Sequence, residues 1–218
     1  MSTAIIGVGN IGKAVATDLT KGGESVVLAA KERSHADHLA GELGALASSA
    51  DVAEAIEQAD TVLFAVWFDT IKELISQHAS RLTGKVVIDP SNPVAFGSDG
   101  KPTKTLPDGV SAGSLIAGLL PDGAHYVKAF GTLAAEFVTT GAHRTPERAV
   151  LFYATDDDAA ASTVARLISA AGFDPVRAGG VQDAARIEMF GDLHQFGGLD
   201  GRLLTADEAQ ASLAGATA

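Results

Sequence analysis

The chain of 218 residues contains no cysteine, a single tryptophan and only two methionines. The lack of cysteine excludes disulfide bonds, thiolate metal sites and a cysteine nucleophile. Basic residues are few as well, since 16 Lys and Arg stand against 27 Asp and Glu, for a net charge of -11. This charge argues against nucleic acid or an anionic membrane as a partner. No signal peptide and no apolar run of roughly 20 residues is present, so a cytoplasmic protein is expected.

The composition that remains is that of an ordinary globular protein. Hydrophobic residues make up 46% of the chain, and there are 24 glycines. A chain of this length holds one large domain, or one domain with a small appendage. We expect a single domain over residues 1–200 and a C-terminal tail over residues 201–218.

The most informative segment is the N-terminal one, where an apolar strand over residues 3–6 runs into Gly7-Val8-Gly9-Asn10-Ile11-Gly12. A helical pattern follows, and this order is typical of a dinucleotide-binding turn. Gly7 would allow the tight turn, Gly9 the approach of a pyrophosphate, and Gly12 the close packing of helix on strand. The pyrophosphate would lie at the N-terminus of the helix, where free N–H groups and the helix dipole attract it.

The rest of the chain alternates between strand and helix patterns. Strands are predicted at residues 25–30, 45–47, 61–66, 85–89, 126–130, 149–153 and 174–177. Helices are predicted at residues 11–21, 34–43, 51–58, 71–78, 111–120, 158–171 and 182–194. Residues 90–109 read as a long irregular loop, as do those between the strand at 126–130 and Arg148. The pattern predicts an α/β fold: a Rossmann-type, doubly wound and mainly parallel sheet with C-terminal strands and a helix.

The second predicted strand ends at Ala30-Lys31-Glu32-Arg33-Ser34, where such proteins recognise the adenosine ribose. Lys31, Arg33 and Ser34 offer two cations and a hydroxyl for a 2′-phosphate, which favours NADP(H). Glu32 leaves NAD open, because an acid at this corner can accept hydrogen bonds from ribose hydroxyls. Lys31 and Arg33 could also be no more than solvated residues of a turn.

Ligands of open α/β sheets bind at the carboxyl ends of the strands. That rule selects Val66, Trp67 and Phe68 after one strand, Ser91, Asn92 and Pro93 after the next, and Ala129 in a third. The aromatic pair could wall the nicotinamide ribose or belong to the core, and Ser91 and Asn92 could bond a ring or form a turn. Lys128 could be structural or anchor an anionic acceptor. His35 and His38 have no third ligand nearby, so no metal site is predicted, and no catalytic residue is assigned.

The chain resembles the NADP-dependent reductases of the deazaflavin coenzyme F(420), which are related to the nucleotide domain of membrane metalloreductases. The resemblance rests on the glycine turn and on the segments 65–68, 87–93 and 127–132. Family members usually carry Asn at the position of Gly131, and residues 189–198 depart from the family pattern. The family implies NADP(H) and direct hydride transfer to a deazaflavin or flavin-like ring, which depends on positioning more than on acid–base groups.

These observations favour an NADP-dependent oxidoreductase with a small-molecule redox acceptor, and ferric or quinone reduction is a further outlet. Two alternatives remain: a nucleotide-binding redox sensor without turnover, and a reductase of a small carbonyl or imine compound. The carbonyl or imine reaction would require a proton donor near the nicotinamide. The resemblance also predicts a homodimer.

Overall fold

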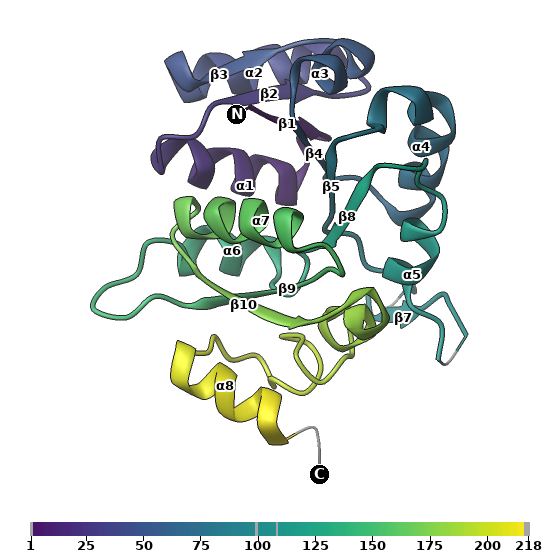
Figure 1. The fold of residues 1–218 in the computed structure, drawn as a ribbon. Coiled ribbons are helices and arrows are strands. Elements are labelled where there is room, and N and C mark those ends of the chain that lie inside the picture. Colours follow the sequence, from purple (N-terminus) through teal and green to yellow (C-terminus); the bar gives the residue numbers. More distant parts are fainter. Residues whose placement is uncertain (1, 99, 108, 216–218) are drawn as a thin grey trace.

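The computed structural model describes residues 2–98, 100–107 and 109–215 (Figure 1). Its centre is an eight-stranded sheet in the order β10-β9-β8-β5-β4-β1-β2-β3. The strands are β1 (Thr3–Ile6), β2 (Val26–Ala29), β3 (Ala47–Ser49), β4 (Thr61–Phe64), β5 (Val86–Asp89), β8 (His125–Lys128), β9 (Val150–Ala154) and β10 (Asp174–Gly179). The expected Rossmann-type α/β fold is confirmed.

The sheet changes direction once. The six strands from β3 to β8 are parallel to one another, while β9 pairs antiparallel with β8 and β10 pairs parallel with β9. The carboxyl ends of the first six strands therefore share one edge of the sheet, and those of β9 and β10 lie at the opposite edge. The central strands are buried on both faces, which explains their unbroken apolar sequences.

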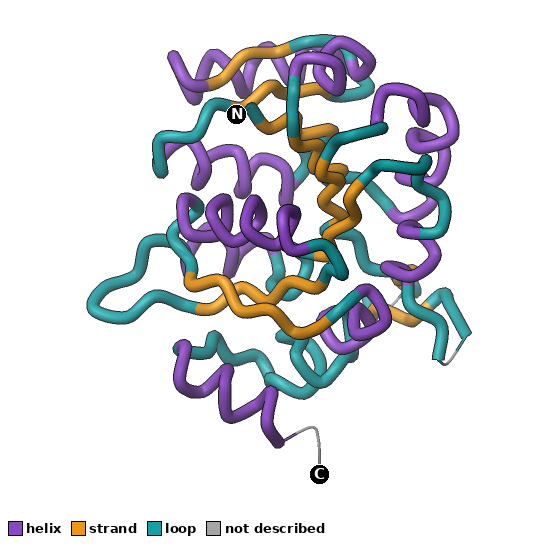
Figure 2. The backbone as a smooth tube through the Cα atoms, in the orientation of Figure 1, coloured by secondary structure: helices purple, strands orange, loops and turns teal. Residues whose placement is uncertain are grey.

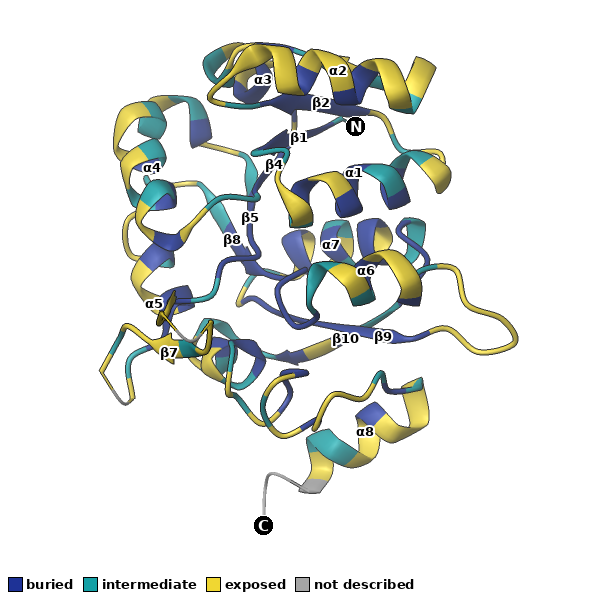
Figure 3. Cartoon of the chain, turned by 180° about the vertical axis from the view of Figure 1, so that it is seen from behind, coloured by how far each residue is buried: buried dark blue, intermediate teal, exposed yellow. Residues whose placement is uncertain are grey.

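Helices cover both faces of the sheet, and the tube in Figure 2 shows them as separate layers. One face carries α1 (Asn10–Lys21), α2 (Arg33–Leu43), α6 (Ala135–Gly141) and α7 (Asp158–Ala170). The other face carries α3 (Val52–Gln58), α4 (Phe68–Leu82) and α5 (Ala112–Ala117). The apolar side chains between these layers form the buried core. Figure 3 colours the buried residues of the strands and helices dark blue.

Several elements differ from the sequence prediction. The segment 90–109 is not wholly irregular, since β6 (Val94–Phe96) and β7 (Pro102–Lys104) pair as an antiparallel hairpin. α6 occupies part of the second segment predicted to be irregular, and β3 begins two residues later than expected. Short 3₁₀ helices occur at η1 (Gly44–Leu46) and η2 (Val181–Ile187).

The C-terminal part differs most. The helix predicted over residues 182–194 ends with η2 at Ile187, and a run of turns follows to residue 201. Within the expected tail, α8 (Ala206–Gly215) packs its buried Ala209 into an apolar cluster with β9 and β10. The Val150 amide donates to the Leu204 carbonyl at 2.9 Å, which fixes this segment to the sheet. Residues 216–218 lie outside the described part of the chain.

Candidate functional site

The three glycines between β1 and α1 have three different surroundings. Gly7 has a φ of +101°, and a Cβ at this position would lie 2.4 Å from the Ala65 carbonyl oxygen. A Cβ on Gly12 would lie 1.9 Å from the Gly7 oxygen, so α1 packs against the turn at a distance that only glycine permits. A Cβ on Gly9 would meet nothing within 4 Å. The backbone of Gly9 is therefore open to the approach of a ligand.

The N-terminus of α1 is suited to an anion. No side chain caps it and no acidic residue lies in its first turn, so the first N–H groups and the positive end of the helix dipole are available. Asn10 is exposed in this turn, while Ile11 packs against the core. These features fit a dinucleotide pyrophosphate at the turn that the sequence predicted.

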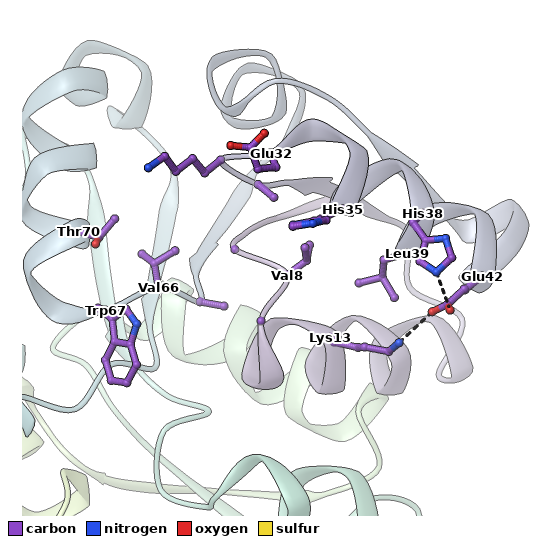
Figure 4. A pocket seen from close by; sticks show the side chains of 15 residues that line it. Val8, Lys13, Glu32, His35, His38, Leu39, Glu42, Val66, Trp67 and Thr70 are labelled. Atoms are coloured by element: carbon purple, nitrogen blue, oxygen red, sulfur yellow. Dashed lines mark hydrogen bonds and ion pairs between the residues drawn. The ribbon is translucent and has the colours of Figure 1, made fainter. Parts of the chain in front are cut away.

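A cleft of about 520 Å³ opens over this turn (Figure 4). The cleft brings together segments after β1, β2 and β4, and its walls are Gly7, Val8, Gly9, Lys13, Ala30, Lys31, Glu32, His35, His38, Leu39, Glu42, Ala65, Val66, Trp67 and Thr70. Six of the residues predicted to bind a cofactor are among them: Gly7, Val8, Gly9, Lys31, Val66 and Trp67. The lining includes both cations and carboxylates, so the cleft has no uniform charge.

Lys31 and Arg33, the two cations predicted to bind a 2′-phosphate after β2, have different surroundings. Lys31 lines the cleft, and among the described residues it has no ion-pair partner. The Arg33 guanidinium is 3.2 Å from an Asp51 carboxylate oxygen and 3.5 Å from one of Asp37. The hydrogen bond to Asp51 raises the pKa of Arg33 above its usual value. Arg33, the first residue of α2, is thus held at the start of α3 and does not line the cleft.

The other predicted residue of this corner, Ser34, is exposed in the first turn of α2 and does not line the cleft either. His35, which the sequence analysis considered only as a metal ligand, does line it. Glu42 limits the cleft at its far end, where it bonds Lys13 at 3.0 Å and His38 at 3.2 Å. The hydrogen bond from Lys13 lowers the pKa of Glu42, so this carboxylate stays charged.

Of the two aromatic residues after β4, Trp67 lines the cleft and Phe68 belongs to the core. Trp67 is 64% exposed and contacts Phe96 of the β6–β7 hairpin edge-on, with ring centroids 6.4 Å apart. Phe68 is buried in the apolar core on the face of the sheet that carries α3, α4 and α5, with the Lys72 ammonium 4.8 Å from its ring centroid. Trp67 is therefore placed to contact a ligand, and Phe68 has the core role that the sequence left open.

The loops after β5 and β8 lie side by side, and we call residues 90–93 and 129–132 together the β5–β8 ledge. The Asn92 side chain joins three segments: its amide donates to the Gly131 carbonyl at 2.9 Å, and its oxygen accepts from the Met189 amide at 2.6 Å. Ser91, Pro93 and Ala129 are buried. None of these predicted residues lines the cleft.

A buried group of charges lies beside this ledge. Asp89 and Lys128 are in register on β5 and β8, with Nζ 3.0 Å from Oδ2. The Glu188 carboxylate is 3.9 Å from Nζ and accepts from the Ser111 hydroxyl at 2.8 Å and from the backbone amides of Ala112 and Gly113. It therefore caps α5 from about 75 residues away in the sequence, a role that no local pattern indicates.

Tyr126 completes the group. Its hydroxyl donates to Asp89 Oδ2 at 2.8 Å. Burial, with the nearby Asp89 carboxylate, raises the pKa of Tyr126 well above its usual value, so the phenol keeps its proton. Lys128, an isolated charge on an apolar strand in the sequence, thus has two buried carboxylates and a phenol around it.

Residues 188–201, which we call the C-terminal cap, cover the ledge. The buried His194 ring bonds the Gly131 carbonyl through Nε2 at 3.0 Å and accepts from the Phe196 amide through Nδ1 at 3.0 Å. These partners require the neutral tautomer with the proton on Nε2. Burial lowers the pKa of His194 to about 4, which agrees with a neutral ring.

Among the described residues, no group of three or more metal-ligating side chains is close enough to hold a metal ion. Within the same part of the chain, no helix has the length and apolar character needed to cross a bilayer.

Part of the chain matches a known protein family. Residues 2–93 match the family described as NADP oxidoreductase, coenzyme F420-dependent. A solved structure of a hypothetical protein from Sinorhizobium meliloti is 32% identical, with a TM-score of 0.77, and the match covers 88% of this chain and 91% of that one. The chain belongs to this family. It is a family of NADP-dependent oxidoreductases, and the matched residues contain the glycine turn and the β2 corner.

Two further structures share the fold. A candidate F420-dependent NADP reductase from Arthrobacter sp. FB24 is 24% identical, with a TM-score of 0.72 over 84% of this chain and 86% of that one. A reductive aminase from Aspergillus terreus, solved with NADPH, is 20% identical with a TM-score of 0.61. That match covers 84% of this chain but only 56% of the aminase. A comparison with curated proteins gave no match.

Proposed function

We propose that this protein is an NADPH-dependent oxidoreductase that passes a hydride to a deazaflavin or flavin-like acceptor. The observation that carries the proposal is the open backbone at Gly9, above the free N-terminus of α1 and inside a cleft lined by Lys31. The cleft fits the diphosphate and adenosine ribose of the nucleotide. The family in which NADP is the cofactor supports the same choice.

The preference for NADPH over NADH rests on Lys31. A 2′-phosphate at the β2 corner would meet this ammonium, whereas Arg33 is already paired with Asp51 and Asp37. Glu32 lines the same cleft and opposes a phosphate, so the preference is expected to be moderate. His35 adds a further hydrogen-bonding group to this wall.

The chain's own part in the reaction is binding and orientation. The turn and α1 would hold the pyrophosphate, and Trp67, at the carboxyl end of β4, would flank the nicotinamide ribose. NADPH, when bound, supplies the hydride with its electron pair. Fixing the two reactants at one edge of the sheet lowers the entropic part of the barrier, which is the contribution expected when a hydride passes directly between two bound rings.

A reductase of imines or small carbonyl compounds is the second candidate. It is favoured by the fold that the chain shares with the reductive aminase solved with NADPH. Reduction of a ferric complex or a quinone is a further reaction that the proposed site would allow, and a redox sensor would bind the nucleotide without turnover.

A homodimer is also proposed, since Leu115 and Leu119 expose 42% and 48% of their surface near α5.

The test is a titration with NADPH and NADH, followed by the emission of the reduced nicotinamide, on the wild type and on Lys31→Ala and Arg33→Ala. Lys31→Ala is expected to weaken NADPH binding about tenfold and NADH binding little, because one charge-assisted contact to phosphate is lost. Arg33→Ala is the matched control and should change the ratio of the two affinities much less. Equal effects of both variants would overturn the role of Lys31.

Turnover is then measured with NADPH and, in separate assays, FMN, a deazariboflavin, menadione, a ferric chelate and a cyclic imine. Oxidation of NADPH by the deazariboflavin or by FMN supports the proposal. Oxidation only by the imine favours the second candidate. Tight NADPH binding without oxidation by any acceptor favours the sensor.

A further inference from the structure

His35 lies in the wall of the nucleotide cleft, in the first turn of α2. Figure 4 shows its ring between the corner at Glu32 and the far end of the cleft at Glu42. Among the described residues, no hydrogen bond or ion pair involves its side chain. The residue is exposed, so both ring nitrogens are available to a ligand.

The fixed charges of the cleft cancel one another. Its lining contains two ammonium groups and two carboxylates, those of Lys13, Lys31, Glu32 and Glu42. The residues that line it from the loop after β4 and from α4 carry no charge. A 2′-phosphate, which is close to doubly charged at neutral pH, therefore meets a balanced field in which Glu32 offsets much of the contribution of Lys31. A histidine that gains a proton changes this balance.

The other histidine of the cleft, His38, is already engaged. Its Nε2 is 3.2 Å from a Glu42 carboxylate oxygen, and the Lys13 ammonium donates to the other oxygen at 3.0 Å. Lys13 lowers the pKa of Glu42, so this carboxylate stays charged. A proton gained by His38 is therefore held by Glu42 at the far end of the cleft. His35 is the imidazole that is left to respond to a ligand.

The start of α2 favours an anion near the same ring. Within the described chain, no side chain caps this helix and no acidic residue lies in its first turn. The positive end of the helix dipole therefore lies at the corner after β2, in the turn that contains His35. Arg33 and Asp37 of the same helix pair with each other at 3.5 Å and do not line the cleft, so they add no net charge to it.

We propose that His35, in its protonated form, binds the 2′-phosphate of NADPH, so that the preference of this protein for NADPH over NADH rises as the pH falls. This inference rests on the proposed function and adds to it a second residue that determines cofactor specificity, together with a dependence on pH. Histidine is the side chain whose charge ordinarily changes between pH 5 and 8, so the response falls in the physiological range.

The sign of the effect follows from proton linkage. Phosphate oxygens beside the ring favour the imidazolium form, so NADPH binding takes up a proton and the Kd falls as the pH falls. NADH carries an uncharged hydroxyl at the same place, and its Kd should not respond. Above pH 6.5 the phosphate itself is mostly a dianion, so a change between pH 6.5 and 8.5 reports the protein and not the ligand.

The experiment measures the Kd of NADPH and of NADH at pH 6.5, 7.5 and 8.5 and at one ionic strength, because salt screens contacts between charges. It uses the wild type, His35→Gln and His35→Lys, and His38→Gln is the matched control on the same helix. Calorimetry in two buffers of different ionisation enthalpy counts the protons taken up with NADPH. Thermal melts at each pH verify that every variant is folded.

The wild type should bind NADPH about fivefold more tightly at pH 6.5 than at pH 8.5, and NADH with little change, because one charge-assisted contact depends on the proton. His35→Gln should bind NADPH with the same Kd at all three pH values and without proton uptake. His35→Lys should restore tight NADPH binding and keep it at pH 8.5. His38→Gln should retain the pH dependence of the wild type.

Two results would overturn the role of His35 while the oxidoreductase stands: NADPH binding by the wild type that does not change with pH, or a pH dependence that His35→Gln leaves intact. A pH dependence that is lost only in His38→Gln would overturn it as well. If neither nucleotide binds at any pH, the proposed function fails, and the role of His35 fails with it.

Discussion

The nucleotide cleft and the β5–β8 ledge are opposite kinds of site within one sheet. The cleft is open, and exposed side chains such as Lys31 and Trp67 line it. The ledge is closed, and its polar atoms are buried below the C-terminal cap. A preformed open cleft lets a ligand bind with little rearrangement, whereas the ledge is held closed by the hydrogen bonds of the cap. The cleft is therefore the part of the sheet edge that a nucleotide reaches without movement of the chain.

The strongest way to break the comparison is to destroy the cleft alone. In Gly12→Ala the new Cβ would overlap the Gly7 oxygen, which lies 1.9 Å from its position. We expect NADPH affinity to fall by about 100-fold or more and stability by about 3 kcal/mol, since the strand-to-helix turn must open. Fluorescence titration and thermal melts measure both effects.

The matched control is Gly41→Ala in the exposed part of α2, where a Cβ meets nothing within 4 Å. It should stabilise the protein by about 0.5–1 kcal/mol, because alanine is the better helix former. Equal losses in the two variants would show that the close packing at Gly12 is unimportant.

The free energy of unfolding should depend on pH through His194, which bonds the ledge at Gly131. Its pKa falls from 6.5 to about 4 on folding because of burial, so below pH 6.5 the unfolded chain binds the proton more readily. Stability should therefore decrease as the pH falls from 6.5 to 4, by about 3 kcal/mol at most. Denaturant melts across this range measure the slope, and His194→Gln should flatten it. A slope unchanged by the substitution would contradict the buried neutral ring.

Gly131→Ala changes the ledge and leaves the cleft intact. Its Cβ would push the Pro90 loop away, so we expect stability to fall by about 2 kcal/mol while the Kd of NADPH stays the same. Gly9→Ala is the mirror variant: its Cβ has free space in the protein but would occupy the approach of the pyrophosphate. It should weaken NADPH without loss of stability. A weaker NADPH affinity in Gly131→Ala, or a loss of stability in Gly9→Ala, would show that the two regions are not independent.

The smallest effect concerns Asp18, a buried carboxylate of α1. Among the described residues its oxygens lack a hydrogen-bond partner, and burial raises its pKa from 3.8 to about 6 despite Lys21 at 3.9 Å. The folded state therefore favours the protonated form, and stability is lost as the pH rises from 3.8 to 6. Asp18→Asn should stabilise the protein at pH 7.5 by about 1–2 kcal/mol and have little effect at pH 3.5. A loss of stability at pH 7.5 would contradict this.

The nucleotide cleft and the β5–β8 ledge also differ in how much of each can be predicted from the sequence. The turn at Gly7–Gly12 and the corner at Lys31 are contiguous motifs, so their place on β1, α1 and β2 follows from local pattern. Asp37 follows Arg33 by four positions on α2, which is a local spacing. What the sequence could not show is that Arg33 is also bound by Asp51, because this partner lies at the start of the next helix, α3.

The ledge and cap were much harder to predict. Glu188 bonds residues that are 75 to 77 positions away, and Asn92 bonds Met189, which is 97 positions away. No local spacing in the sequence predicts these hydrogen bonds. The helix predicted beyond Ile187 fails because the chain takes a left-handed turn at Phe190 and carries several glycines after it. The β6–β7 hairpin was missed because its prolines and glycines resemble those of an irregular loop.

Trp67 gives the molecule a built-in optical reporter. It is the only tryptophan in the chain, it is 64% exposed, and it touches both the cleft wall and the β6–β7 hairpin through Phe96. Its indole emission therefore comes from one known position and needs no added label. A nucleotide entering the cleft would quench or shift that emission, and a movement of the hairpin would change it through Phe96. Stopped-flow recording of this one signal would show whether the hairpin moves during nucleotide binding or after it.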